Sequence, residues 1–226
     1  MPTKNKYAIN AKITEAKVRQ IVKLFVVDLD ASQIAKITSL NRNTVNRYIK
    51  AIRERIACES ELLSPFAGEV EVDESYFGAR QAKGLRGPGA RGKTIVFGLF
   101  KRQRKVYTEI VPDCSRATLQ GIIRGRVKLE TVIHSDGWRG YNGLADLAYQ
   151  KHFRVGHGKN EFATEHTHIS GIESFWAFAK TRLVRFRGIH KHSFYFHLKE
   201  CEFRFNNRGQ DLYKIILKLL REKPLC

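Results

Sequence analysis

The stretch GEVEVDESYFG, residues 68–78, decides the fold of the largest part of this sequence. Apolar and acidic residues alternate along it, so that Val70 and Val72 fall on one face of an extended chain and Glu71 and Asp73 on the other. A period of two predicts a β-strand. One face of this strand is apolar, and the opposite face carries a row of carboxylates.

The sequence that follows predicts further strands and helices in an order that fits a mixed sheet. Two strands joined by a short basic turn are expected within 94–113, a helix within 115–127 and a fourth strand at 130–136. A further short strand is expected near 153–155, and the chain is expected to be mainly helical from about residue 168. Antiparallel strands followed by a crossover helix and a parallel strand indicate an α/β fold, a mixed sheet flanked by helices.

The preceding residues predict an all-α domain. Residues 13–29 carry apolar side chains mostly at helical spacing, and a short helix that Ser32 can cap comes next. A turn through 39–41 leads into a longer helix. This is the pattern of a helix-turn-helix, with an ordinary helical hairpin as the alternative. The DNA-binding hypothesis rests on the exposed start of the second helix, which carries Arg42, Asn43, Thr44, Asn46 and Arg47.

The helical pattern breaks between residues 58 and 65, where we expect a domain boundary. The two predicted domains are a helix-turn-helix DNA-binding domain over 1–62 and an α/β domain over 63–226.

The charge balance indicates a polyanionic partner. Lys and Arg total 41 against 22 Asp and Glu, which gives a formal net charge of +19. Nucleic acid is the leading candidate. A membrane surface is the alternative, but no apolar anchor lies beside the basic clusters.

Neither a membrane span nor a secretion signal is expected, because no run of 18 apolar residues occurs and the first residues are polar. The four cysteines form no CxxC pair, which fits reduced thiols and a cytoplasmic location.

A glycine-rich basic segment, ARQAKGLRGPGARGK at 79–93, follows the first strand. Such a composition predicts a flexible loop. Its position close to a carboxylate would suit a phosphate backbone, with a plain solvated linker as the alternative. The basic residues proposed to contact DNA are Lys83, Arg86, Arg91 and Lys93.

Three carboxylates are candidates for a metal site. Asp73 lies on the first strand and Asp136 at the end of the fourth, and a right-handed crossover commonly makes two such strands neighbours. Glu173 lies on a predicted helix, at the margin of an apolar stripe and in a row with Lys180 and Arg187. Carboxylate oxygens suit Mg²⁺, and two such ions can activate a nucleophile and stabilise a leaving oxygen. Spacing alone leaves the choice open, because Glu71 shares the strand face of Asp73.

Five motifs together resemble small bacterial insertion-sequence transposases of the ISXO type, which have a DDE catalytic domain. They cover about residues 65–210 in order and read VEVDESYFG, GLRGPGARGK, HSDGWRGY, GIESFWAFAKTRLVRFRG and HLKECEFRFNNR. The resemblance implies a ribonuclease-H-like fold in which Asp73, Asp136 and Glu173 are catalytic and bind two Mg²⁺ ions, with Mn²⁺ as a substitute. Lys180 would be the lysine that follows the catalytic glutamate. Many relatives carry an N-terminal cysteine zinc ribbon, which this sequence lacks, so recognition of the element ends must rest on the helices.

The residues after Asp136 are predicted to line the DNA path, with structural packing of the aromatic side chains as an equal alternative. They are Trp138, Arg139 and Tyr141, and Lys180 and Arg187 are predicted to contact DNA phosphates nearby.

The hypothesis is therefore a DNA transposase that binds the ends of an insertion sequence, cleaves DNA and transfers the freed strand. The expected partners are double-stranded DNA and further copies of the chain, at least a dimer, associated with the nucleoid; no membrane and no small-molecule cofactor is expected. The alternatives are a non-catalytic helix-turn-helix regulator and a nuclease of the same fold that cuts without joining.

Overall fold

The computed structural model describes residues 5–62, 66–78, 93–102, 105–136, 149, 151–155, 169–186 and 189–226. These residues form two compact units. Unit 1 comprises Met1–Leu62 and Asn207–Cys226, and unit 2 comprises Leu63–Asn206.

The described residues of unit 1 form helices and their connections, with one isolated β-bridge between Ala8 and Leu225. Its elements are α1 (Glu15–Val26), α2 (Ala31–Thr38), α3 (Arg42–Glu61) and α7 (Leu212–Glu222). Each helix turns an apolar face inward, and the buried set includes Ile21 and Phe25 of α1, Ile34 of α2, Val45, Ile49 and Ile52 of α3, and Leu220 of α7. The sequence alone groups α7 with residues 63–226, whereas its contacts place it in unit 1 beside α1.

The caps of α2 and α3 fix the turn between them. Asp30, not Ser32, caps α2: its carboxylate accepts from the N–H of Gln33, and the side chain of Gln33 accepts from the N–H of Asp30. The expected cap at Ser32 is therefore wrong. Ser39 ends α2 in the left-handed conformation, and Asn41 caps α3 by accepting from the N–H of Asn43.

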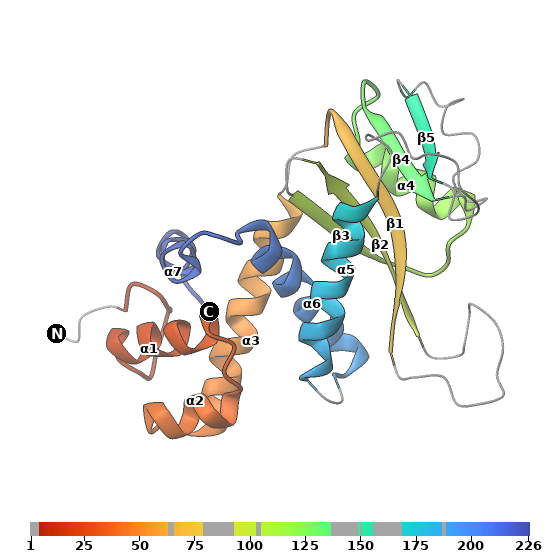
Figure 1. Ribbon diagram of the computed structural model, residues 1–226. Coiled ribbons are helices and arrows are strands. Elements are labelled where there is room, and N and C mark those ends of the chain that lie inside the picture. The colour runs from red at the N-terminus through yellow and green to blue at the C-terminus, as the bar shows by residue number, and fades with distance from the viewer. Residues whose placement is uncertain are drawn as a thin grey trace, which may run out of the picture. The chain divides into compact units, whose positions relative to one another are not determined.

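Unit 2 is a five-stranded mixed sheet (Figure 1). Its strands are β1 (Glu69–Phe77), β2 (Thr94–Lys101), β3 (Lys105–Val111), β4 (Val132–Asp136) and β5 (Lys151–Val155), in the order β3-β2-β1-β4-β5. The first three pair antiparallel, while β4 is parallel to β1 and β5 is parallel to β4. This is a ribonuclease-H-like arrangement, and the predicted fold class is confirmed.

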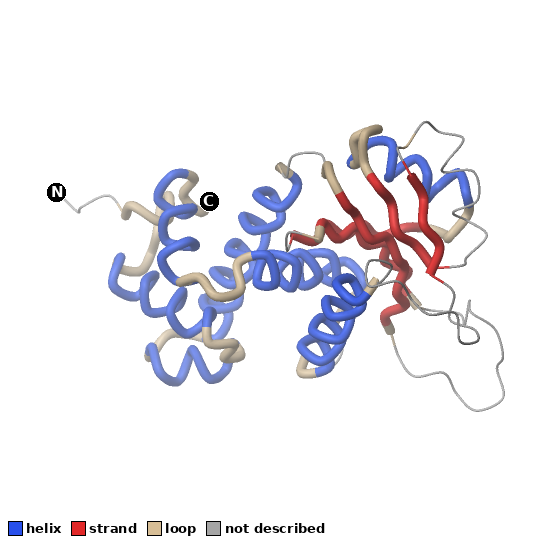
Figure 2. Tube along the Cα trace, turned by 45° about the horizontal axis from the view of Figure 1, so that its top comes forward, coloured by secondary structure: helices blue, strands red, loops and turns tan. Residues whose placement is uncertain are grey.

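Helices cover both faces of this sheet (Figure 2). α4 (Arg116–Arg126), which Ser115 caps as expected, packs on the face that carries Val70 and Val72. α5 (Ser170–Val184) and α6 (Lys191–Asn206) pack on the opposite face, to which the acidic side chains of β1 belong. Because the side chains of residues 68–78 alternate, one face of β1 presents apolar residues to α4. The other face presents carboxylates that bond to α5.

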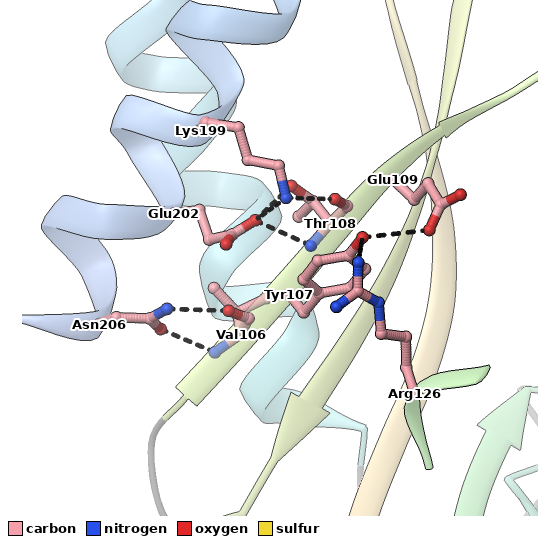
Figure 3. A network of polar contacts seen from close by, with 8 residues as sticks. All are labelled: Val106, Tyr107, Thr108, Glu109, Arg126, Lys199, Glu202 and Asn206. Carbon is pink, nitrogen blue, oxygen red and sulfur yellow. Dashed lines mark hydrogen bonds and ion pairs between the residues drawn. The ribbon is translucent and has the colours of Figure 1, made fainter. Parts of the chain in front are cut away.

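The outer edge of β3 is covered by side chains of α6 (Figure 3). Asn206 bonds both backbone groups of Val106, at 2.7 and 2.8 Å. The carboxylate of Glu202 accepts from the backbone N–H and the hydroxyl of Thr108, at 2.9 and 2.7 Å, and Lys199 Nζ donates to the Thr108 carbonyl at 2.8 Å. Three side chains of one helix face therefore satisfy the backbone groups that a further strand would otherwise bind.

No helix in the described part of the chain combines the length and apolar character that crossing a membrane requires.

Candidate active site

Two aspartates lie side by side at the centre of the sheet. The parallel pairing of β1 with β4 ends at Val72 and Ser135, and the next residue on each strand is an aspartate, Asp73 and Asp136. Paired residues of neighbouring strands project to the same face. The sequence-based expectation that a crossover makes these strands neighbours is confirmed.

Asp73 is tied to α5 through a single hydrogen bond. The indole Nε1 of Trp176 donates to Asp73 Oδ2 at 2.9 Å. Burial raises the pKa of Asp73 to about 7, and the charges of Glu74 and Asp136 add to this effect, while the bond from Trp176 opposes it. A carboxylate with this pKa is only partly ionised at neutral pH, so ionising Asp73 in the folded protein reduces its stability.

The aspartate pair suits a divalent cation. Carboxylate oxygens are the donors that Mg²⁺ and Mn²⁺ accept in proteins. A cation between the two groups would offset both the burial of Asp73 and its repulsion by Asp136. Within the described residues, however, no three His, Cys, Asp or Glu side chains are arranged to hold a metal ion. The described geometry therefore supplies two ligands and not a complete triad.

Glu173, the third predicted ligand, lies in the first turn of α5 and is exposed. Burial raises the pKa of Glu71, and the charge of Glu173 adds to that rise. The helix that carries Glu173 packs on the sheet face to which the aspartates belong.

Gly98 makes the contact between Trp176 and Asp73 geometrically possible. It is the antiparallel partner of Asp73 on β2. A methyl group at this position would lie 2.6 Å from Cζ2 of Trp176 and 2.7 Å from Cδ1 of Ile172. Only glycine lets α5 lie this close to the strand beside Asp73.

Gly98→Ala is therefore expected to lower the free energy of unfolding by about 2 kcal/mol, because Trp176 and Ile172 must both move away from the sheet. Gly121→Ala is the matched control, since a methyl group on that exposed face of α4 meets nothing within 4 Å and should stabilise the helix by up to about 1 kcal/mol. Urea unfolding of both variants measures the difference. Equal stability of the two variants would contradict the close approach.

Lys180 lies further along α5 and is exposed. Its Nζ is 5.9 Å from the centroid of the Phe77 ring at the end of β1, and Phe77 in turn contacts Trp176 edge-on. The ammonium group is thus on the sheet side of the helix, beyond the aspartates.

The predicted DNA-contact residues of α3 lie in unit 1, and their side chains are accessible. Arg42, Asn43, Asn46 and Arg47 are exposed and Thr44 is half-buried. The guanidinium of Arg47 lies over the ring of Tyr48, 5.6 Å from its centroid. Lys93, just before β2, is half-buried. The other predicted contacts lie outside the described residues, namely Lys83, Arg86, Arg91, Trp138, Arg139, Tyr141 and Arg187.

The bond between Trp176 and Asp73 was not predicted from the sequence. The available signal was an indole N–H three residues after Glu173, on a stripe otherwise made of purely apolar groups. A buried indole nitrogen usually has a hydrogen-bond partner, and the acidic face of β1 offers one.

Comparison with known proteins places the sequence of this chain among transposase-related sequences. The model of the ISXO2-like transposase domain matches residues 65–206, which include both aspartates and all of α5. An uncharacterized transposase-like protein of Haemophilus influenzae is 47% identical over 116 residues, which are 51% of this chain and 93% of that protein. An uncharacterized protein in transposable element ISH50 of Halobacterium salinarum is 28% identical over 172 residues, which are 67% of this chain and 58% of that protein.

Among solved structures, the catalytic core domain of BIV integrase is similar with a TM-score of 0.39 and 15% identity, over 70% of this chain and 99% of that one. The assignment rests on the match over residues 65–206, which is more than half of the sequence. The chain therefore belongs to the ISXO2-like transposase domain family.

Proposed function

We propose that this protein is a DNA transposase that binds the ends of an insertion sequence, cleaves DNA with the help of divalent metal ions and transfers the cut strand to a target. The observation that carries the proposal is the pair Asp73 and Asp136 at the centre of the sheet, within the segment that matches the transposase family. The proposal includes double-stranded DNA as partner and a homo-oligomer, at least a dimer, in a bacterial cytoplasm in association with the nucleoid.

Asp73 and Asp136 would hold the metal, with Glu173 as third ligand from α5. When bound, two Mg²⁺ ions, or Mn²⁺ in their place, supply activation of a water or a 3′-hydroxyl and stabilisation of the leaving oxygen.

The protein's own residues orient these groups. Trp176 donates to Oδ2 of Asp73 and so restrains the orientation of that carboxylate. Lys180, on the same helix as Glu173, provides a positive charge for a phosphate next to the reacting bond. The hydrogen bond from Trp176 links α5 to Asp73, the proposed metal ligand on β1.

The proposal assigns recognition of the element ends to α3. Its first two turns present Arg42 and Arg47 with three polar side chains between them, and Asn41 caps its N-terminus. Phosphate contacts supply much of the affinity of such a helix, and base contacts supply specificity.

Arg47→Ala is expected to weaken binding to an element-end duplex and to reduce the slope of log K against log salt by about 1, because one phosphate contact is lost. Lys218→Ala, at an exposed side chain of α7, is the control that removes the same charge from the same unit without touching α3. Fluorescence anisotropy at several salt concentrations measures both slopes. An equal loss in the two variants would indicate diffuse attraction by net charge and no dedicated recognition helix.

The decisive experiment compares the wild-type protein with Asp136→Asn on a labelled duplex that carries the DNA flanking the gene, in the presence of Mg²⁺. We expect the wild-type protein to cut and join, and the variant to bind the duplex without cutting or joining. Cutting without joining would identify a nuclease. Equal binding with no cutting by either protein would identify a non-catalytic regulator.

A further inference from the structure

The first turn of α5 is capped from another element of the fold. Helix N-termini expose N–H groups that need acceptors. The residue before α5 is Ile169, whose side chain cannot accept a hydrogen bond, and it makes no such cap. Instead, Oε2 of Glu71 on β1 accepts from the N–H of Ile172 at 2.9 Å. The cap therefore comes from a residue 101 positions away in sequence.

Glu71 is not available as a metal ligand in this arrangement. Only 3% of its side chain is exposed. Oε2 is occupied by α5, and Oε1 lies 3.6 Å from Nε of Arg102. Burial raises the pKa of Glu71, whereas the N–H of Ile172 and the charge of Arg102 lower it. Asp73 shares its strand face but is only half-buried and lies beside Asp136, and these differences separate the two acids that the sequence could not separate.

Two bonds join β1 to α5 at matching intervals. Glu71 accepts from Ile172, and Asp73 accepts from Trp176. The two acceptors are two residues apart on β1, and the two donors are four residues apart on α5. Two strand residues advance about 6.7 Å and four helical residues about 6.0 Å, so both bonds can form only in one register of helix on strand. Gly171 permits this register, since a methyl group there would overlap the ring of Phe100.

We propose that Glu71 is a positioning residue of the active site: by capping α5 from β1, it sets where Glu173, the residue next to Ile172, stands relative to Asp73 and Asp136. This inference rests on the proposed function, because it assigns Glu173 to the same metal site. A negative charge on β1 does not by itself explain the cap of α5. Glu69 lies on the same strand and also pairs with Arg102, but among the described residues it makes no hydrogen bond to α5.

Two substitutions of Glu71 distinguish the effect of its side-chain length from the effect of its charge. Glu71→Gln keeps an oxygen at the same distance from Ile172 but removes the charge, whereas Glu71→Asp keeps the charge and shortens the reach by one methylene. Positioning predicts that Gln retains Mn²⁺ affinity within about threefold of wild type and that Asp loses about tenfold, the usual size for a group that orients a ligand. Glu69→Gln is the matched control and should behave as wild type.

Mn²⁺ binding to the purified full chain is followed through the electron paramagnetic resonance signal of the free ion, and Asp73→Asn gives the background. Amide hydrogen exchange of residues 170–173 gives a second readout, which should accelerate in Glu71→Asp and stay slow in Glu71→Gln. The opposite ranking of Gln and Asp in Mn²⁺ affinity would show that Glu71 acts through its charge and would overturn the inference. So would faster exchange in Glu71→Asp with unchanged Mn²⁺ affinity, since the cap would then be purely structural.

Failure of the proposed function gives a different result. In that case wild type binds no more Mn²⁺ than Asp73→Asn, and the positioning role falls with the metal site, while the exchange rates still report whether Glu71 caps α5.

Discussion

Asp73→Asn is expected to stabilise the metal-free protein at pH 8 and to reduce DNA cleavage to background in the same variant. The pKa of Asp73 is raised to about 7, chiefly by burial. Above pH 4 the unfolded chain carries an ionised Asp73 while the folded protein retains the proton, so folding takes up a proton and stability falls as pH rises from about 4 to about 7. Asparagine does not ionise and keeps an oxygen for the N–H of Trp176.

The difference in pKa corresponds to at most roughly 4 kcal/mol, and solvent access to the half-buried carboxylate reduces the expected gain to roughly 2 kcal/mol. The gain should be present at pH 8 and nearly absent at pH 4.5. Urea unfolding in EDTA at the two pH values measures it. A gain of equal size at both pH values would mean that the stability difference between the wild-type protein and Asp73→Asn comes from packing and not from ionisation.

Asp113→Asn is the control with the opposite sign. Hydrogen bonds from Ser115 and Thr118 lower the pKa of this exposed carboxylate. Its contribution to stability is therefore present at neutral pH and is lost as the pH falls through the lowered pKa, so the variant should be the less stable protein at pH 8.

Glu202→Ala is expected to cost about 3–5 kcal/mol of unfolding free energy, the largest loss we anticipate for a residue outside the site. Glu202 is fully buried and accepts from Thr108 twice and from Lys199 at 3.1 Å. Its removal leaves the ammonium of Lys199 buried without its counter-charge and the N–H of Thr108 without its acceptor.

Chemical denaturation measures the loss, and Glu222→Ala is the control. Glu222 lies in an exposed ion pair with Lys218, and breaking such a pair should change stability by less than about 0.5 kcal/mol. The double variant Lys199→Met, Glu202→Leu removes both charges and should recover part of the loss. A double variant as unstable as Glu202→Ala would show that the polar bonds to β3, and not the buried charge of Lys199, dominate the loss.

The central part of the fold could be predicted because its signals are local. Alternation in 68–78 gave β1 with its two faces, and Asp136 at the end of a short apolar run marked the end of β4. The crossover rule then made these strands neighbours and brought Asp73 beside Asp136.

Other features depend on partners that are distant in sequence. Glu71 and Asp73 look equivalent on the strand, and only their different contacts with α5 distinguish them. The burial of Lys199 and Glu202 could not be predicted from the residues around them, because Thr108, which both side chains bind, lies on a different element. The placement of α7 beside α1 could not be predicted from local sequence patterns either, because the two helices are far apart in the sequence.

That placement has a consequence for the order in which the protein matures during synthesis. Leu225 bonds the backbone of Tyr7 and Ile9, and Arg55 donates to the carbonyl of Pro224. The helices proposed to read DNA thus emerge from the ribosome first, yet the partners that complete their unit emerge after the whole sheet has been made. A nascent chain paused anywhere before α7 carries the proposed recognition helix in an unfinished unit. Unit 1 is therefore completed only after residues 63–206, which carry the proposed catalytic residues, have been translated.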